Sequence, residues 1–163
     1  MPNTATGTGL VASALVSLLV AACTTATPGA SPTAAAPAAH DPATLAVLAT
    51  LNQELGVEFE PAGPHHQVGR APDGVELDLI GMPVEQAVLS VPAGQPGAGY
   101  SYLAHLRDLL HGPARVYDWV ADGLTCRSIP DGSCETSFSQ GNIAARFSDG
   151  GPGYVVVSIS RRP

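Results

Sequence analysis

The chain has 163 residues, and fourteen Asp and Glu residues against seven Arg give a formal net charge of -7 at pH 7. This acidic balance argues against nucleic acid as a partner and against direct electrostatic adhesion to anionic headgroups. Every Asp, Glu and Arg follows His40, so the charged part of the chain is separate from an uncharged N-terminal region. The charged part is long enough to form one domain with its own core.

An apolar run lies near the N-terminus. Residues 10–20 read LVASALVSLLV, which is shorter than the roughly 20 apolar residues that cross a bilayer as a helix. An uncharged run of this length is typical of the apolar core of a signal peptide. Two alternatives remain for it: an ordinary secretory signal with Cys23 merely nearby, or a buried helix of the fold.

The run closes with Leu19-Val20-Ala21-Ala22-Cys23, which resembles the lipobox of bacterial lipoprotein signal peptides. The resemblance covers residues 1–23 only, and residues 1–9 lack the Lys or Arg usual in such signals. It implies cleavage before Cys23, a palmitate-type lipid on the Cys23 sulfur, and an exported protein anchored to the extracytoplasmic face of a bacterial membrane. We therefore expect a signal peptide over 1–22.

A spacer follows Cys23. Residues 24–40 read TTATPGASPTAAAPAAH, with no acidic or basic side chain other than a histidine and no large apolar residue. Such a tract cannot bury enough surface to offset its ordering entropy. We expect residues 23–40 to be the lipidated cysteine and a disordered Ala/Thr/Pro/Ser spacer, and residues 41–163 to be a single domain.

Cysteine parity supports this organisation. The chain has three cysteines, and a lipid on Cys23 leaves Cys126 and Cys134 as an even pair. An oxidising compartment allows the pair to bridge, and the turn sequence Pro-Asp-Gly at 130–132 can bring two cysteine-bearing strands face to face. We expect a disulfide bond between Cys126 and Cys134.

The first half of the domain alternates helix and strand signals. Asp41 followed by Pro42 predicts a helix that ends before Gly56, with leucines recurring at helical spacing. Strands are predicted at 57–60, 65–70 and 75–80, the last two as a hairpin whose Val75, Leu77 and Leu79 face the core. Residues 84–91 favour a third β-branched strand over a short helix.

The second half begins with a glycine-rich loop at 92–99 and predicted helices at 100–111 and 113–122, with Gly123 as a helix cap. Period-two patterns then predict an antiparallel meander over 124–128, 134–139, 142–148 and 154–161. The expected fold class is α+β: an antiparallel sheet, built from two strand groups, packed on one face by two or three helices.

No segment carries a specific catalytic or cofactor motif. His65 and His66 point to opposite faces of a strand, and His105, Asp108 and His111 are helical neighbours without a nucleophile elbow. The loop at 94–99 matches no phosphate-binding motif. We therefore expect no catalytic residues, no metal site and no cofactor.

Four aromatic residues form the best binding candidate from the sequence: Tyr100, Tyr102, Tyr117 and Trp119, which share neighbouring helices. The expected function is that of a cell-envelope lipoprotein with a non-catalytic module that binds an envelope protein or a small ligand. The alternatives are a structural or assembly-accessory lipoprotein and a small envelope hydrolase. The expected partners are the membrane, through the lipid anchor, and that protein or ligand, without nucleic acid.

Overall fold

The computed structural model describes residues 40–129, 133–149 and 153–162. The predicted signal peptide, Cys23 and nearly all of the spacer therefore lie outside the described residues. So does the predicted turn at 130–132. No helix in the described part of the chain is long and apolar enough to cross a membrane.

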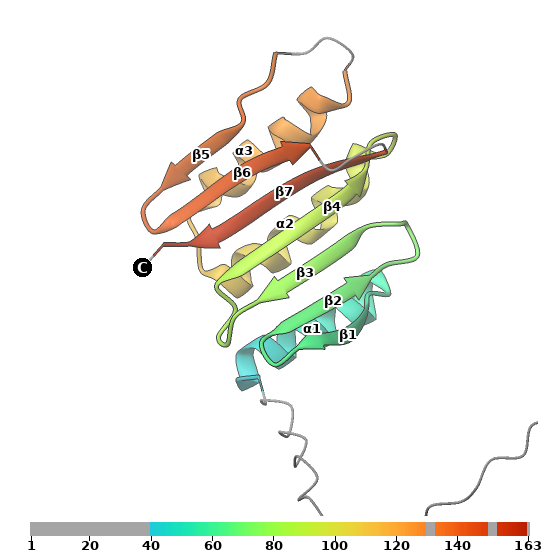
Figure 1. Ribbon diagram of the computed structural model, residues 1–163, viewed down its shortest axis with the longest axis vertical. Coiled ribbons are helices and arrows are strands. Elements are labelled where there is room, and N and C mark those ends of the chain that lie inside the picture. The colour runs from blue at the N-terminus through green and yellow to red at the C-terminus, as the bar shows by residue number, and fades with distance from the viewer. Residues whose placement is uncertain (1–39, 130–132, 150–152, 163) are drawn as a thin grey trace, which may run out of the picture. The chain divides into compact units, whose positions relative to one another are not determined.

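Seven strands form one antiparallel sheet in the order β1-β2-β3-β4-β7-β6-β5 (Figure 1). Pairing of β4 with β7 brings residues 86–92 beside residues 154–160 and joins the two predicted strand groups into a single sheet. The strands are β1 Glu58–Gly63, β2 His66–Arg70, β3 Glu76–Ile80, β4 Gln86–Pro92, β5 Ser137–Gln140, β6 Ile143–Asp149 and β7 Tyr154–Arg161.

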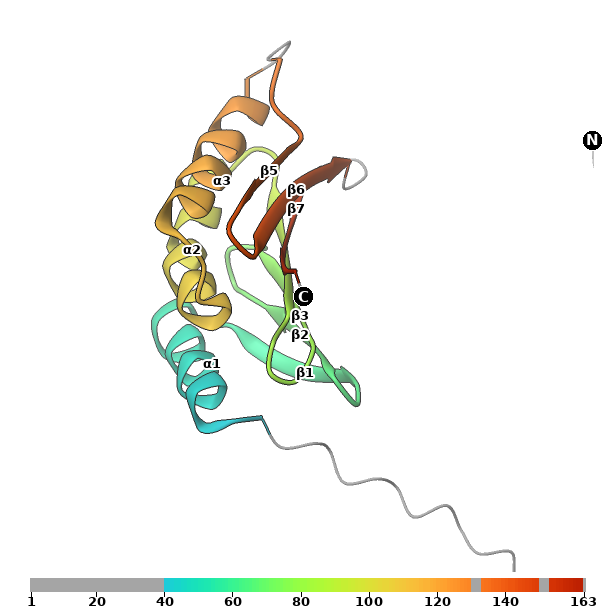
Figure 2. The same cartoon turned by 90° about the vertical axis from the view of Figure 1, so that its left-hand side faces the viewer.

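Three helices, α1 Pro42–Leu55, α2 Pro96–Leu110 and α3 Ala114–Arg127, lie against one face of this sheet (Figure 2). The core fills the space between the two layers, and its fully buried members include Leu51, Leu77, Leu89, Leu106 and Ile159. Among the described residues, no helix lies over the opposite face of the sheet. The predicted α+β class, with helices on one face of an antiparallel sheet, is confirmed.

Local signals set the ends of α1 as predicted. Asp41 caps the helix by accepting hydrogen bonds from the backbone amides of Ala43 and Thr44, both at 3.0 Å. The Thr44 hydroxyl also donates to Asp41 at 2.7 Å, and this bond is the main reason that the pKa of Asp41 is lowered. At the other end Gly56 adopts a left-handed φ of 67°, which a glycine accommodates without strain.

The predicted hairpin is also confirmed. Strands β2 and β3 pair antiparallel, and Val75, Leu77 and Leu79 are each at most 2% exposed. The Asp73 carboxylate organises the turn between them, because it accepts from the Val75 amide at 3.1 Å and from the Tyr102 hydroxyl at 3.2 Å. Residues 86–92 form a strand, so the strand interpretation of this segment was the right one.

The helical predictions need two corrections. Helix α2 begins at Pro96, so the second half of the predicted 92–99 loop is helical. Helix α3 continues to Arg127, so the predicted cap at Gly123 and the predicted strand at 124–128 are wrong. The helix continues because Leu124, one turn beyond Val120, is fully buried. Position 123 lies inside the helix and is a glycine because a Cβ there would come within 2.3 Å of the Phe147 ring.

Candidate functional site

The uncovered face of the sheet presents alternate residues of every strand. Because side chains of a strand point alternately to its two faces, the neighbours of buried core residues point away from the helices. On β7, for example, Val157 and Ile159 are fully buried while Ser158 between them is partly exposed. We call this surface the open face.

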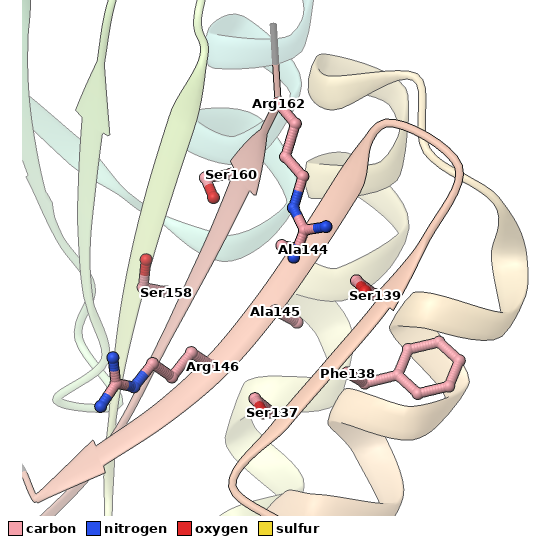
Figure 3. A pocket seen from close by; sticks show the side chains of 9 residues that line it. All are labelled: Ser137, Phe138, Ser139, Ala144, Ala145, Arg146, Ser158, Ser160 and Arg162. Carbon is pink, nitrogen blue, oxygen red and sulfur yellow. The ribbon is translucent and has the colours of Figure 1, made fainter.

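The open face is hollowed over β5, β6 and β7. A cavity of about 430 Å³ lies there, and we call it the Arg-Ser hollow (Figure 3). Figure 3 shows the Phe138 ring pointing away from the serines, and that ring stacks on Trp119 with centroids 5.6 Å apart. The lining residues are Ser137, Phe138, Ser139, Ala144, Ala145, Arg146, Ser158, Ser160 and Arg162.

Strand register explains why these residues meet. Two cross-strand rows run from β5 through β6 to β7: Ser137, Arg146 and Ser158 form one, and Ser139, Ala144 and Ser160 form the other. The small side chain of Ala144 therefore lies between two serines and leaves the floor of the hollow low. The larger Arg146 follows two residues later on the same strand face.

Arg162 lies beyond the second row. Its backbone amide donates to the carbonyl of Asn142 at 2.6 Å, which continues the pairing of the two chain segments past β7. In Figure 3 its guanidinium group reaches back towards Ala144, while the Arg146 side chain extends towards Ser158. Arg162 is opposite Asn142, and Arg146 lies four positions after Asn142 in the chain. The backbone positions of the two arginines are therefore about 14 Å apart along the strand, with Ala144 midway.

The polar groups of the hollow are predominantly hydrogen-bond donors. Ser158 Oγ accepts from Gln86 Nε2 at 3.1 Å, so its hydroxyl hydrogen is directed elsewhere and can be donated to a ligand. Among the side chains of residues 40–129, 133–148 and 153–162, no carboxylate lies within 4.0 Å of Arg146 or Arg162. Both guanidinium groups are exposed in an overall acidic protein.

The same face carries the opposite arrangement over β1, β2 and β3. There Arg70 pairs with Glu60 at 3.1 Å and lies 3.9 Å from Glu76. His66 Nε2 lies 2.8 Å from Asp78 Oδ1. The cations of this half are therefore paired with neighbouring carboxylates on the same surface.

The four aromatic residues predicted as a binding rim do not gather in one place. Tyr102 is fully buried, and its burial, together with the adjacent Asp73 carboxylate, raises its pKa well above the usual range. Tyr100 and Tyr117 both line a groove of about 360 Å³ between α2 and α3. Trp119 lines a separate hollow near Cys126, and its Nε1 donates to Glu135 at 2.9 Å.

Burial also limits what Tyr117 offers to a ligand. It is 5% exposed, and its hydroxyl donates to the Leu106 carbonyl at 3.3 Å. Burial is the main reason that the pKa of Tyr117 rises to about 12. Tyr100 is 40% exposed, with its hydroxyl hydrogen-bonded to Thr125, so only Tyr100 and Trp119 of the four give accessible aromatic surface.

Cys126 and Cys134 lie at disulfide distance, with their Cα atoms 6.0 Å apart. This spacing is compatible with the expected bond. The elements that carry the two residues differ from the prediction, because Cys126 belongs to α3 and Cys134 to the segment that leads into β5. The pair therefore joins a helix to the sheet edge rather than two facing strands.

The weaker sequence candidates also have definite places. His105, considered with Asp108 and His111, instead lies 3.4 Å from Glu54 of α1. His111 ends α2 in the left-handed conformation, with φ 51°. Among the described residues there is no group of three or more His, Cys, Asp or Glu side chains that could hold a metal ion.

The Arg-Ser hollow was missed at the level of sequence. Its signal is the repeated Ser-x-Ser pattern at Ser137/Ser139 and Ser158/Ser160, which puts hydroxyls on one face of two strands. That pattern alone does not place Arg146 and Arg162 beside them. The register of β5, β6 and β7 does.

No protein-family model, curated protein or solved structure matches this chain. Its function is therefore argued from its own residues.

Proposed function

We propose that this protein is a cell-envelope lipoprotein whose α+β domain is a non-catalytic binding module, with its ligand site in the Arg-Ser hollow. The observation that carries the proposal is the concave, hydroxyl-lined cavity of about 430 Å³ on a sheet face that no helix covers. Ligand sites are typically concave and contain a few convergent polar groups. The lipobox-like run at Cys23 supports the envelope location.

The ligand site is tested by filling it. In Ala144→Trp the indole would occupy the floor between Ser139 and Ser160, whereas Val68→Trp adds the same side chain to β2 on the other half of the open face. Native mass spectrometry of the lipoprotein, released from its own envelope in a mild detergent, should detect a bound small molecule in the wild type and in Val68→Trp. Ala144→Trp should lack it. A wild type that carries no small molecule would contradict the proposal.

The anchor is tested separately. Metabolic labelling with palmitate should depend on Cys23, and Cys23→Ala should abolish the label while the domain is still made. Unchanged labelling in Cys23→Ala would refute lipidation at this residue.

One observation favours a second candidate, an assembly-accessory lipoprotein. In the described part of the chain β5 pairs only with β6, and its sequence Ser-Phe-Ser-Gln has no charge or proline. The other edge strand, β1, is protected by Glu58, Glu60, Pro61 and a register shift. An edge like β5 can pair with the same strand of a second copy.

Light scattering of the lipoprotein in detergent tests this second candidate. The wild type should form a species larger than the monomer, and Gln140→Lys, which puts a charge on the β5 edge, should return it to the monomer. A monomeric wild type at all concentrations contradicts the candidate.

A further inference from the structure

The Arg-Ser hollow combines two kinds of donor around one apolar floor. Four serine hydroxyls line it together with the two guanidinium groups, and no carboxylate is among its lining residues. Each guanidinium has five N–H donors and each serine has one O–H donor. A site with this excess of donors is complementary to a ligand with many acceptor oxygens.

The charge of the hollow differs from that of the whole protein. The chain has a net charge of -7, yet within the described part of the chain Arg146 and Arg162 are the only charged residues that line this cavity. The nearest paired acids of the open face, Glu76 and Asp78, lie on β3, three strands from β6. Three strand spacings are about 14 Å, which exceeds the Debye length of about 8 Å at physiological ionic strength. The charged side chains that line the hollow are therefore both positive.

Phosphate matches these donors better than a carboxylate does. A phosphate group offers three acceptor oxygens in a tetrahedral arrangement, and guanidinium groups bind it through two parallel hydrogen bonds. A carboxylate offers two oxygens in one plane. Donors in the hollow approach from the strand floor, at Ser139 and Ser160, and from the arginines on either side of Ala144.

We propose that the Arg-Ser hollow binds the phosphate groups of a phosphorylated ligand, with Arg146 and Arg162 as the charged contacts and the serine hydroxyls as additional donors. This inference rests on the proposed function, because it names the ligand class for the same site. A soluble phosphorylated compound and a lipid headgroup both supply this chemistry.

Pyrophosphate is the probe, titrated calorimetrically into the lipoprotein in dodecyl maltoside micelles, which carry no phosphate. Each arginine should contribute about tenfold in affinity, because a charge-assisted hydrogen bond changes the dissociation constant by about tenfold or more. Arg146→Gln/Arg162→Gln should therefore bind about a hundredfold more weakly. Added salt should weaken wild-type binding.

Arg70→Gln is the matched control, since it removes the same charge from the paired half of the open face. It should leave pyrophosphate affinity unchanged. Thermal melting of both variants verifies that they are folded. Absence of pyrophosphate binding to the wild type, succinate binding as tight as pyrophosphate, or an equal loss in Arg70→Gln would each overturn the inference.

Nanodiscs distinguish the two sources of phosphate. Pyrophosphate affinity that falls in phospholipid nanodiscs, relative to the phosphate-free dodecyl maltoside micelles, indicates that a headgroup occupies the hollow; equal affinity in discs and micelles indicates a soluble ligand. If Ala144→Trp loses the co-purified molecule and Arg146→Gln/Arg162→Gln keeps it, the binding module stands and the phosphate inference fails. If the wild type carries no co-purified molecule, the proposed function fails.

Discussion

The two halves of the open face use their cations in opposite ways. Over β1 to β3, Arg70 lies within ion-pair distance of Glu60 and Glu76, so its positive charge is neutralised on the surface itself, and His66 lies beside Asp78. Over β5 to β7, Arg146 and Arg162 stand among serines. An arginine with carboxylate neighbours is already occupied, whereas one surrounded by hydroxyls retains its donors for a ligand.

The two halves also differ in how they are held to the helices. The β1 to β3 half is tied to α2 by the hydrogen bonds from Tyr102 to Asp73 in the hairpin turn. The β5 to β7 half packs on α3 and has the cysteine pair at its end. We therefore expect the two halves to respond differently to substitution.

Removing the cysteine pair should have the largest effect. Cys126→Ser/Cys134→Ser should lower the free energy of unfolding by about 2 to 3 kcal/mol, because a bridged loop of this length restricts the unfolded chain. Urea denaturation with and without reductant measures it: reductant should destabilise the wild type and leave the double variant unchanged. Two reactive thiols in the denatured, unreduced wild type would refute the bond.

Adding a methyl group at Gly123 should rank next. Its Cβ would lie 2.3 Å from a ring carbon of the buried Phe147, so Gly123→Ala should cost about 2 kcal/mol of unfolding free energy by overpacking. Gly69→Ala, on the other half, would place its Cβ 2.6 Å from both the partly buried Phe59 ring and Cγ1 of the buried Val57. It should cost less than Gly123→Ala, because the approach is less close and the Phe59 ring can shift.

Gly97→Ala is the control for these glycines. It lies in α2 with no heavy atom within 4 Å of the added Cβ, so the change should stabilise the helix by about 0.5 to 1 kcal/mol. Urea denaturation of the three variants compares them. A cost at Gly69 equal to that at Gly123 would contradict the difference between the halves.

The buried tyrosines should make the domain sensitive to alkali. Burial raises the folded-state pKa of Tyr117 to about 12, above the ordinary value of 10.0. The neutral phenol is therefore favoured in the folded state, and its contribution to stability is complete below pH 10 and is lost as the pH rises through about 12.

Tyr117→Phe should make stability fall less steeply over that pH window, at a cost of about 1 kcal/mol at neutral pH for the lost hydrogen bond to Leu106. Urea denaturation across the alkaline range measures both effects. The control is Tyr154→Phe, which changes an exposed tyrosine. If the free energy of unfolding falls with pH as steeply in Tyr117→Phe as in the wild type, the role of burial is contradicted.

The smallest expected effect compares the arginines of the two halves. Arg70→Gln removes exposed ion pairs and should cost about 0.5 kcal/mol or less, decreasing with added salt. Arg146→Gln should leave the free energy of unfolding unchanged, since its guanidinium makes no ion pair within the described part of the chain. Chemical denaturation at low and high salt checks both. A larger loss at Arg146 would show that it is structural.

Much of the fold could be predicted because its signals are local. The Asp41 cap, the Gly56 stop and the alternation of Val75, Leu77 and Leu79 each depend on a few neighbouring residues. Prediction failed at 124–128, where Gly123 suggested a helix cap and a period-two pattern suggested a strand. The burial of Leu124 explains why the helix continues, and the packing against Phe147 explains why a glycine stands inside it.

The sequence by itself determined the domain's class, most of its elements and the acidic charge of the chain. Tertiary structure decided which residues share a surface. Arg162 is distant along the chain from Ser137 and Arg146, and the register of three antiparallel strands brings the three residues around one cavity. A period-two pattern fixes which face a side chain occupies, but its cross-strand neighbours depend on pairing between segments that the pattern does not specify.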